Sequence, residues 1–203
     1  MEDPRLYAPA ARRNRDPILE ILRSILPEHG LALEIASGSG EHVVHFAANL
    51  PKWTFQPTDP GPTARASVAA WIAATGVANV LGPLDLDAAS PHWPIEKADA
   101  ILCVNMIHIS PWAATEGLFA HAREILPQGA PLYLYGPYKR GGAHNAPSNE
   151  AFDASLRAQN GAWGVRDLEA VAACADIAGF GQPQIFEMPA NNLSVIFRRH
   201  AAR

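Results

Sequence analysis

Residues 33–42 read LEIASGSGEH. An apolar run carrying Glu34 passes through a turn that contains Gly38 and Gly40, and it opens directly into a helical pattern from Glu41. Glycine suits such a turn because a backbone without a Cβ can take positive φ or approach a ligand closely. The free N–H groups and the positive dipole end of the helix face the turn. This segment therefore predicts a strand–turn–helix unit that binds a nucleotide-like cofactor.

The same alternation of strand and helix continues outward from residue 31 to residue 136. Continuous apolar runs such as residues 98–104 are typical of strands buried on both faces of a parallel sheet. Strand–helix–strand repeats predict parallel pairing with right-handed crossovers. The predicted strands are residues 31–36, 53–58, 79–84, 98–104, 130–136, 184–188 and 193–198. The last two are so close together that they predict an antiparallel hairpin.

Apolar stripes and capping residues predict the helices. Asp16 and Pro17 are an N-cap and first-turn pair, so we expect the first helix to begin there and to stop before Pro27. Gly76 and Gly179 are typical residues after a helix end. The other predicted helices are residues 41–50, 62–75, 110–126, 149–159 and 167–178.

The 203 residues predict one α/β domain, residues 1–203, with a single core. Residues 137–166 interrupt the alternation and are rich in Gly, Asn, Pro and Ser. A long insertion at the end of a central strand is more often a binding loop than a linker. We therefore expect residues 137–166 to form a lid or substrate loop.

Composition and charge narrow the class of protein. A net charge of −4 argues against a nucleic-acid binder, although Arg12, Arg13 and Arg15 are clustered. No apolar run approaches the ~20 residues that span a bilayer, and the N-terminus does not resemble a signal peptide. Cys103 and Cys174 lie in apolar patterns and are expected to be buried, reduced thiols. These features predict a cytoplasmic protein that binds neither nucleic acid nor membrane.

Spacing excludes two cofactor classes at the glycine turn. A dinucleotide-binding turn requires G-x-G-x-x-G/A, and Val43 stands at the third small position. A phosphate-binding loop requires a Lys directly after its last glycine, and Glu41 follows Gly40 instead. Once these two motifs are excluded, the remaining pattern is an acidic residue near the strand end followed by a glycine turn.

That string resembles motif I of class I S-adenosylmethionine-dependent methyltransferases, usually acidic-x-G-x-G-x-G, with Ala36 in place of the first glycine. The resemblance extends over residues 31–136. It implies S-adenosyl-L-methionine as the cofactor and a Rossmann-like class I methyltransferase fold. That fold is a seven-stranded, mostly parallel sheet of order 3-2-1-4-5-7-6, with the last strand antiparallel and helices on both faces.

The resemblance also implies roles for single residues. Glu34 would orient the amino-acid end of the cofactor, and Asp59 would accept hydrogen bonds from both ribose hydroxyls, as a carboxylate can. Asp85 would receive the adenine amino group, with Leu86 packed beside the ring. His42 is expected to cover the cofactor. The full predicted cofactor set is Glu34, Ala36, Gly38, Gly40, His42, Asp59, Asp85, Leu86 and Asn105.

Further strings resemble one narrower family, the methyltransferase-like 26 family, a domain family of unknown function. They lie both inside and outside the generic fold, and they include Arg13-Asn14, residues 40–43, residues 163–167 and residues 188–193. This resemblance covers nearly the whole chain but implies no particular substrate.

Chemistry is expected beyond the carboxyl ends of the strands, where open parallel sheets bind ligands. Methyl transfer from a sulfonium chiefly requires alignment, with a base only where the acceptor carries a proton. His108 is the first candidate base because imidazole titrates near pH 6.5; a helix cap or a pocket wall is its alternative role. Tyr138 and His144 are further catalytic candidates. Asn191 and Trp163 are candidate substrate contacts.

The sequence leaves some alternative functions open and disfavours others. The segment 105–108 reads NMIH and lacks the Pro-Pro string common in methyltransferases that act on planar amines. His42 and His45 lack an evident third ligand, so no metal is predicted. The leading prediction is a methyltransferase with a small-molecule acceptor. A non-catalytic, cofactor-binding scaffold is the alternative, and a nicotinamide oxidoreductase is disfavoured by the broken fingerprint.

Overall fold

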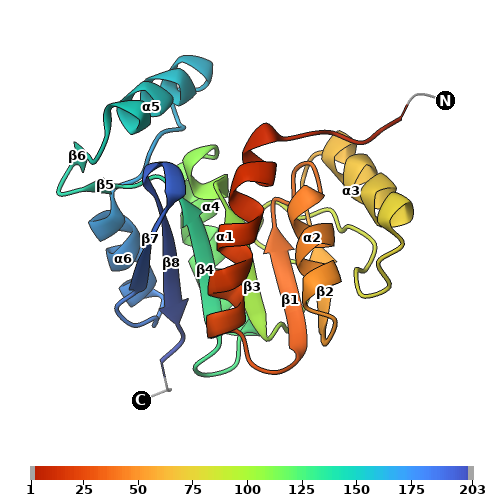
Figure 1. Ribbon diagram of the computed structural model, residues 1–203. Coiled ribbons are helices and arrows are strands. Elements are labelled where there is room, and N and C mark those ends of the chain that lie inside the picture. Colours follow the sequence, from red (N-terminus) through yellow and green to blue (C-terminus); the bar gives the residue numbers. More distant parts are fainter. Residues whose placement is uncertain (1–2, 201–203) are drawn as a thin grey trace.

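The computed structural model describes residues 3–200 and shows a central sheet with helices on both faces (Figure 1). The sheet has six strands in the order β2-β1-β3-β4-β8-β7. Neighbours among β2, β1, β3 and β4 are parallel, and β8 is antiparallel to both β4 and β7. The strands are β1 Gly30–Ile35, β2 Trp53–Pro57, β3 Ala100–Val104, β4 Pro131–Gly136, β7 Gln184–Met188 and β8 Asn192–Arg198. The mostly parallel α/β sheet predicted from the alternation is therefore confirmed.

Two apolar clusters hold the helices to the sheet. On one face Ile18, Phe46 and Val68 pack against the sheet, and on the other Phe119 and Val171 do so. The first face is covered by α1 Pro9–Ile25, α2 Glu41–Asn49 and α3 Pro62–Thr75, and the second by α4 Trp112–Ile125 and α6 Leu168–Ile177. Cys103 is buried, as predicted, whereas Cys174 is half-buried; both thiols are free.

The predicted seven strands and their order are wrong, because residues 79–84 do not form a strand. They make only isolated parallel bridges, Phe55 to Val80 and Thr58 to Leu84. Leu81 N still donates to Phe55 O at 2.8 Å, so the segment runs beside β2. Pro57 and Pro83 lie between the two bridges and have no N–H to donate to a ladder. The two prolines explain the missing strand.

The first helix is also longer than predicted. It begins at Pro9 rather than at Asp16-Pro17, and Pro17 lies inside it. Tertiary contacts hold the extra turns: Ala8 N donates to the buried Glu41 carboxylate at 2.5 Å, and Asn14 is itself buried. The predicted end before Pro27 is confirmed, with Leu26 as the C-cap.

Residues 137–166 fold into a hairpin and a helix beyond the sheet. The hairpin pairs β5 Lys139–Arg140 with β6 Ala143–His144, and α5 Pro147–Gln159 follows. Figure 1 shows α5 above the end of the sheet where β4 stops, beside the β7–β8 turn. Asn149 donates to Asn191 O at 2.9 Å, which fastens α5 to that turn.

Backbone strain is confined to the carboxyl edge of the sheet. Within residues 3–200, the non-glycine residues with positive φ are Ala36, Asn105, Ala190 and Asn191. They follow β1, β3 and β7, which run in one direction and end at this edge. Such conformations cost of order 1–3 kcal/mol each and cluster at functional sites. The edge is therefore the place to look for a binding site.

Candidate functional site

The glycine turn after β1 adopts the left-handed backbone that the sequence predicted. Ala36, Gly38 and Gly40 have φ values of 55°, 56° and 89°. At Gly40 a Cβ would lie 2.8 Å from Val68 Cα, so close packing of α3 also requires glycine there. Ala36 takes the same region with its Cβ, at a cost of about 1–2 kcal/mol. The turn therefore keeps its left-handed shape although Ala36 replaces the first glycine of motif I.

Asp59 is joined directly to this turn. Gly38 N donates to Asp59 Oδ2 at 3.0 Å, and Gly61 N donates to Oδ1 at 2.8 Å. Ser37 N donates to Thr58 O at 2.8 Å, which ties the ends of β1 and β2 together. Each carboxylate oxygen accepts more than one hydrogen bond, so Asp59 retains acceptor capacity for a ligand.

Glu34 is a buried acid with an unused oxygen. Its residue is 2% exposed, and Oε2 has no hydrogen-bond partner in the part of the chain that the structure describes. Burial raises the pKa of Glu34 from 4.5 to about 7; a hydrogen bond with Ser37 lowers it, and the charge of Asp59 raises it further. A buried carboxylate is costly without a cationic partner. The site is therefore suited to a ligand that brings positive charge to Glu34.

Arg65 connects Asp85 to the same end of the sheet. Its guanidinium donates to Asp59 O at 2.8 Å and lies 3.1 Å from Asp85 Oδ2. The Asp85 side chain is 70% exposed, which leaves it accessible to a ligand. Leu86 is buried in the cluster under α4. Predicted cofactor residues from three separate segments thus lie together.

His42 belongs to a polar chain that the sequence did not predict. His42 Nε2 donates to Asn14 Oδ1 at 2.7 Å, and Asn14 hydrogen-bonds the Tyr135 hydroxyl. Burial lowers the pKa of His42 to about 4, with help from the charges of His45 and Arg15, so the ring is neutral near pH 7. The chain links α2, α1 and the end of β4. Asn14 was overlooked because the predicted helix began after it.

His108 and Tyr138 lie together, but both are fully buried. Their rings are 5.0 Å apart in an edge-to-face arrangement. Arg166 N donates to His108 Nδ1 at 3.2 Å, whereas His108 Nε2 and the Tyr138 hydroxyl have no partner within residues 3–200. Burial and the charge of Arg166 lower the pKa of His108 to about 3. His108 is therefore neutral and shielded from solvent in this conformation.

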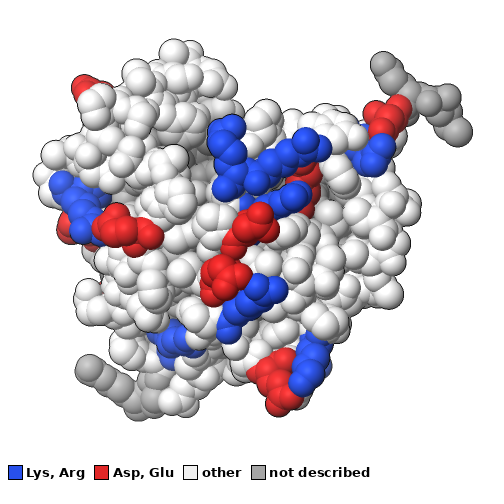
Figure 2. Space-filling view, viewed as in Figure 1, with Lys and Arg blue, Asp and Glu red and all other residues white. Residues whose placement is uncertain are grey.

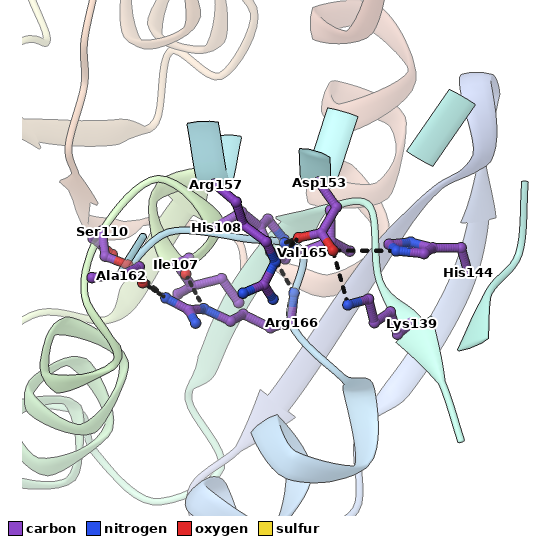
Figure 3. A network of polar contacts seen from close by, with 10 residues as sticks. All are labelled: Ile107, His108, Ser110, Lys139, His144, Asp153, Arg157, Ala162, Val165 and Arg166. Carbon is purple, nitrogen blue, oxygen red and sulfur yellow. Dashed lines mark hydrogen bonds and ion pairs between the residues drawn. The ribbon is translucent and has the colours of Figure 1, made fainter. Parts of the chain in front are cut away.

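His144 lies in an ion cluster around Asp153 (Figure 3). Lys139 Nζ and His144 Nε2 lie 2.9 Å and 3.3 Å from Asp153 Oδ2, and Arg157 Nε lies 3.2 Å from Oδ1. Val165 N also donates to Oδ1, at 2.7 Å. Burial alone would raise the pKa of Asp153, but the bonds from Lys139, Val165 and Arg157 outweigh it and lower the pKa to about 2. Asp153 therefore anchors α5 as a carboxylate.

Arg166 ties this cluster to the loop after β3. Its guanidinium donates to Ile107 O at 2.8 Å and to Ser110 O at 2.6 Å, and Figure 3 shows it beneath the Asp153 cluster. Sequence reasoning missed both Asp153 and Arg166, since each acts on partners that are distant in the chain. The hydrogen bonds of Arg166 therefore hold residues 162–167 against residues 105–110.

The two predicted substrate residues lie near opposite ends of α5. Asn191 Nδ2 donates to Ser148 Oγ at 3.3 Å, so its amide binds α5. Trp163 is half-buried, and its backbone N–H donates to Asn160 O at 2.9 Å. Trp163 is therefore part of the 137–166 segment, and Asn191 contacts it from the β7–β8 turn.

A groove of about 730 Å³ lies elsewhere, between α4 and α6. Its lining includes Trp112, Phe119 and Ile177 and none of the predicted site residues.

In residues 3–200 no group of three or more His, Cys, Asp or Glu side chains is arranged to hold a metal. The same part of the chain has no helix with the length and apolar character needed to cross a membrane.

Comparison with protein families gives one match. The family model described as "Protein of unknown function (DUF938)" matches residues 5–199. That description does not test the narrower resemblance to the methyltransferase-like 26 family, which stays a prediction.

Several solved structures that are similar to this chain are described as methyltransferases. An O-methyltransferase family protein from Burkholderia thailandensis is 16% identical, with a TM-score of 0.80 over 96% of this chain and 58% of that one. An O-methyltransferase family 2 protein from Planctomyces limnophilus, in complex with apigenin, is 18% identical with a TM-score of 0.77, over 94% and 60%. Human N-acetylserotonin methyltransferase, in complex with SAM, is 14% identical with a TM-score of 0.69, over 92% and 55%. The chain spans little more than half the length of these proteins, and at such identities the likeness establishes the fold.

Proposed function

Because this chain belongs to the DUF938 family, described as proteins of unknown function, we propose a function from the site itself: an S-adenosylmethionine-dependent methyltransferase with a small-molecule acceptor. The observation that carries the proposal is Glu34, a buried carboxylate with an unpartnered oxygen beside the left-handed turn. The turn also holds Asp59, whose remaining acceptor capacity suits a ribose diol.

The residues present fit this cofactor. Glu34 would face its positively charged amino-acid end, and the backbone at Gly38 and Gly40 would lie close to it. Asp59 would accept from the ribose hydroxyls, and the exposed Asp85 would accept from the adenine amino group. When bound, the cofactor supplies a methyl group on a sulfonium, which is open to in-line attack.

The chain's own part in the reaction would be alignment and exclusion of water. Residues 137–166 would cover the acceptor, with Asn191 and Trp163 as proposed contacts. His108, Tyr138 and His144 remain the proposed catalytic residues. His108 is neutral, as a base must be, but it is fully buried and its pKa of about 3 makes it a weak base, so it would act only after the residues packed around it move. An acceptor that already lacks its proton would need no base.

The similar solved structures support a small acceptor. One of them is a complex with apigenin, a small molecule. At the fold level these relatives are methyltransferases, and we extend that activity to this chain as a proposal.

Calorimetric titration with S-adenosylmethionine tests the proposal. We expect micromolar or tighter binding by the wild type and a loss of roughly ten- to a hundredfold in Asp59→Ala, because two hydrogen bonds to a charged acceptor are removed. Asp176→Ala is the matched control, since Asp176 is an exposed acid of α6. No binding heat and no thermal stabilisation of the wild type would refute the function. Equal affinity of Asp59→Ala and wild type would refute the assignment of Asp59.

A further inference from the structure

Helix α6 is apolar on the side that faces away from the sheet as well as on the side that packs against it. Val171 is buried in the cluster under the helix. Ala170, Ala173, Cys174 and Ile177 line the groove of about 730 Å³ on the outer side, at the spacing of one helical stripe. Ile177 is 84% exposed, more than any other large apolar side chain of residues 3–200. A helix that is apolar on both sides is typical of one that is covered on both sides.

The face of the molecule that α1 covers has a different surface. Figure 2 shows acidic and basic side chains gathered over α1, as is usual for a helix in contact with water. The stripe of α6 in the groove contains no charged residue. Exposed apolar patches of this kind mark interaction sites in soluble proteins. The groove between α4 and α6 is therefore a candidate interface.

Helix α4 adds two unpaired charges of opposite sign to this groove. Glu116 and Arg123 are both exposed and both line it. Neither forms an ion pair with another residue of the part of the chain that the structure describes. Glu124, the remaining charged residue of the lining, lies 3.4 Å from His121. Glu116 precedes the exposed Ala120 by about one helical turn and Arg123 follows it by about one turn, so the row is acidic on one side of a small residue and basic on the other.

Such a row of charges is complementary to a reversed copy of itself. In a two-fold dimer both subunits contribute the same surface. A two-fold axis that crosses α4 near Ala120 would set α4 antiparallel to the α4 of a second copy, and each copy's Glu116 would then face the other's Arg123. The small side chain of Ala120 would let the two helices approach closely. A partner surface of a single sign of charge would instead oppose one of the two charges, which disfavours such a partner.

We propose that the groove between α4 and α6 is the interface of a two-fold homodimer, in which α4 packs antiparallel to the α4 of a second copy and Ile177 is covered. The groove contains none of the predicted site residues, so dimerisation would not occupy the predicted cofactor site. The inference is independent of the proposed methyl transfer.

Sedimentation velocity of the full chain over a range of concentrations measures the assembly. We expect the wild type to form a dimer with a micromolar or lower dissociation constant. Ile177→Asp should weaken the dimer by about a hundredfold or more, because a carboxylate would be buried without a partner. Ile177 is mostly exposed, so the variant monomer should keep its fold, which circular dichroism checks. Glu20→Arg, at an exposed acid of α1 on the opposite face, is the control and should dimerise like the wild type.

Charge reversal tests the antiparallel arrangement of α4. Glu116→Arg and Arg123→Glu would each bring like charges together twice in the dimer, and each should weaken it by about tenfold or more. The double variant exchanges the two charges and should restore the affinity of the wild type. A partner other than a second copy would give no such restoration.

The thiol of Cys174 gives a second measurement, because it lines the groove and is half-buried, whereas Cys103 is buried. Its reaction with a thiol reagent should slow as the concentration of wild-type protein rises. The rate in Ile177→Asp should not depend on concentration.

A wild type that stays monomeric at every concentration would overturn the inference, as would a dimer that Ile177→Asp leaves intact. Charge reversals without effect, or a double variant that does not recover, would refute the antiparallel pairing of α4. A monomeric wild type that binds the apolar dye anilinonaphthalene sulfonate, with binding lost in Ile177→Asp, would overturn the dimer in favour of an apolar ligand in the groove.

Discussion

Replacing Glu34 by Gln should stabilise the cofactor-free protein at alkaline pH. The folded-state pKa of Glu34 is raised from 4.5 to about 7, chiefly by burial. An acid with a raised pKa favours folding below its unfolded value and loses that contribution as pH rises through the folded value. A difference of about 2.5 pKa units corresponds to about 3 kcal/mol at pH 8.5 and to less than about 1 kcal/mol at pH 5. Gln cannot ionise, so Glu34→Gln avoids this loss.

Urea unfolding at pH 5, 7 and 8.5 measures the effect. We expect the free energy of unfolding of Glu34→Gln, relative to wild type, to rise by about 2–3 kcal/mol between pH 5 and pH 8.5. The same variant should bind S-adenosylmethionine more weakly, because the carboxylate that faces its positive charge is gone. Glu28→Gln, at an exposed acid paired with Lys52, is the control and should show no such rise.

A stability difference that does not change with pH would refute the reasoning. It would mean that Glu34 ionises in the folded state as readily as in the unfolded chain. Lower stability of Glu34→Gln at pH 8.5 would refute it as well, because the carboxylate would then have a partner in the folded protein that the amide cannot replace.

Three further predictions concern the strained turn and the 137–166 segment. Ala36→Gly should raise the free energy of unfolding by about 0.5–1 kcal/mol in urea titrations, since relief of about 1–2 kcal/mol of left-handed strain exceeds the chain entropy that glycine loses; a loss of stability would contradict this. Asp153→Asn should cost about 2 kcal/mol from pH 5 to 7, because a pKa lowered from 3.8 to about 2 contributes stability above 3.8 that disappears as pH falls through 2. Its stability gap to wild type should narrow below pH 4, and the Val165 amide should exchange faster in hydrogen-exchange measurements; a constant gap would exclude the ion cluster as the cause. Arg166→Gln should speed exchange across residues 105–110, while protection of β1 stays unchanged; loss of protection in both would indicate general unfolding instead.

Strain, burial and unpaired polar groups coincide at one edge of this fold. Ala36 and Asn105 hold left-handed conformations there, and Glu34 keeps an unpaired oxygen close by. Such costs persist where the surrounding structure enforces them, and a ligand can offset them on binding. The carboxyl edge therefore carries the features of a binding site more clearly than the groove between α4 and α6.

The sequence alone determined the features that depend on neighbouring residues. The LEIASGSGEH segment predicted its strand, its left-handed turn and its helix, because backbone sterics and glycine positions act over a few residues. The alternation of apolar runs and caps predicted the parallel sheet for the same reason. Even the absence of the strand at residues 79–84 has a local signal in Pro57 and Pro83, although the apolar pattern outweighed it in the prediction.

Only the tertiary structure decided which of these residues meet and which are buried. The contact of Asp59 with Gly38 spans 21 residues, and the bond from Arg166 N to His108 spans 58. Burial of His108 and the contact of His144 with Asp153 depend on how residues 137–166 fold over the edge. Protonation and exposure are set by the surrounding dielectric and charges, which chain segments create only when they pack. The sequence therefore indicated a candidate site, and the packing determines the charge, partners and exposure of each side chain.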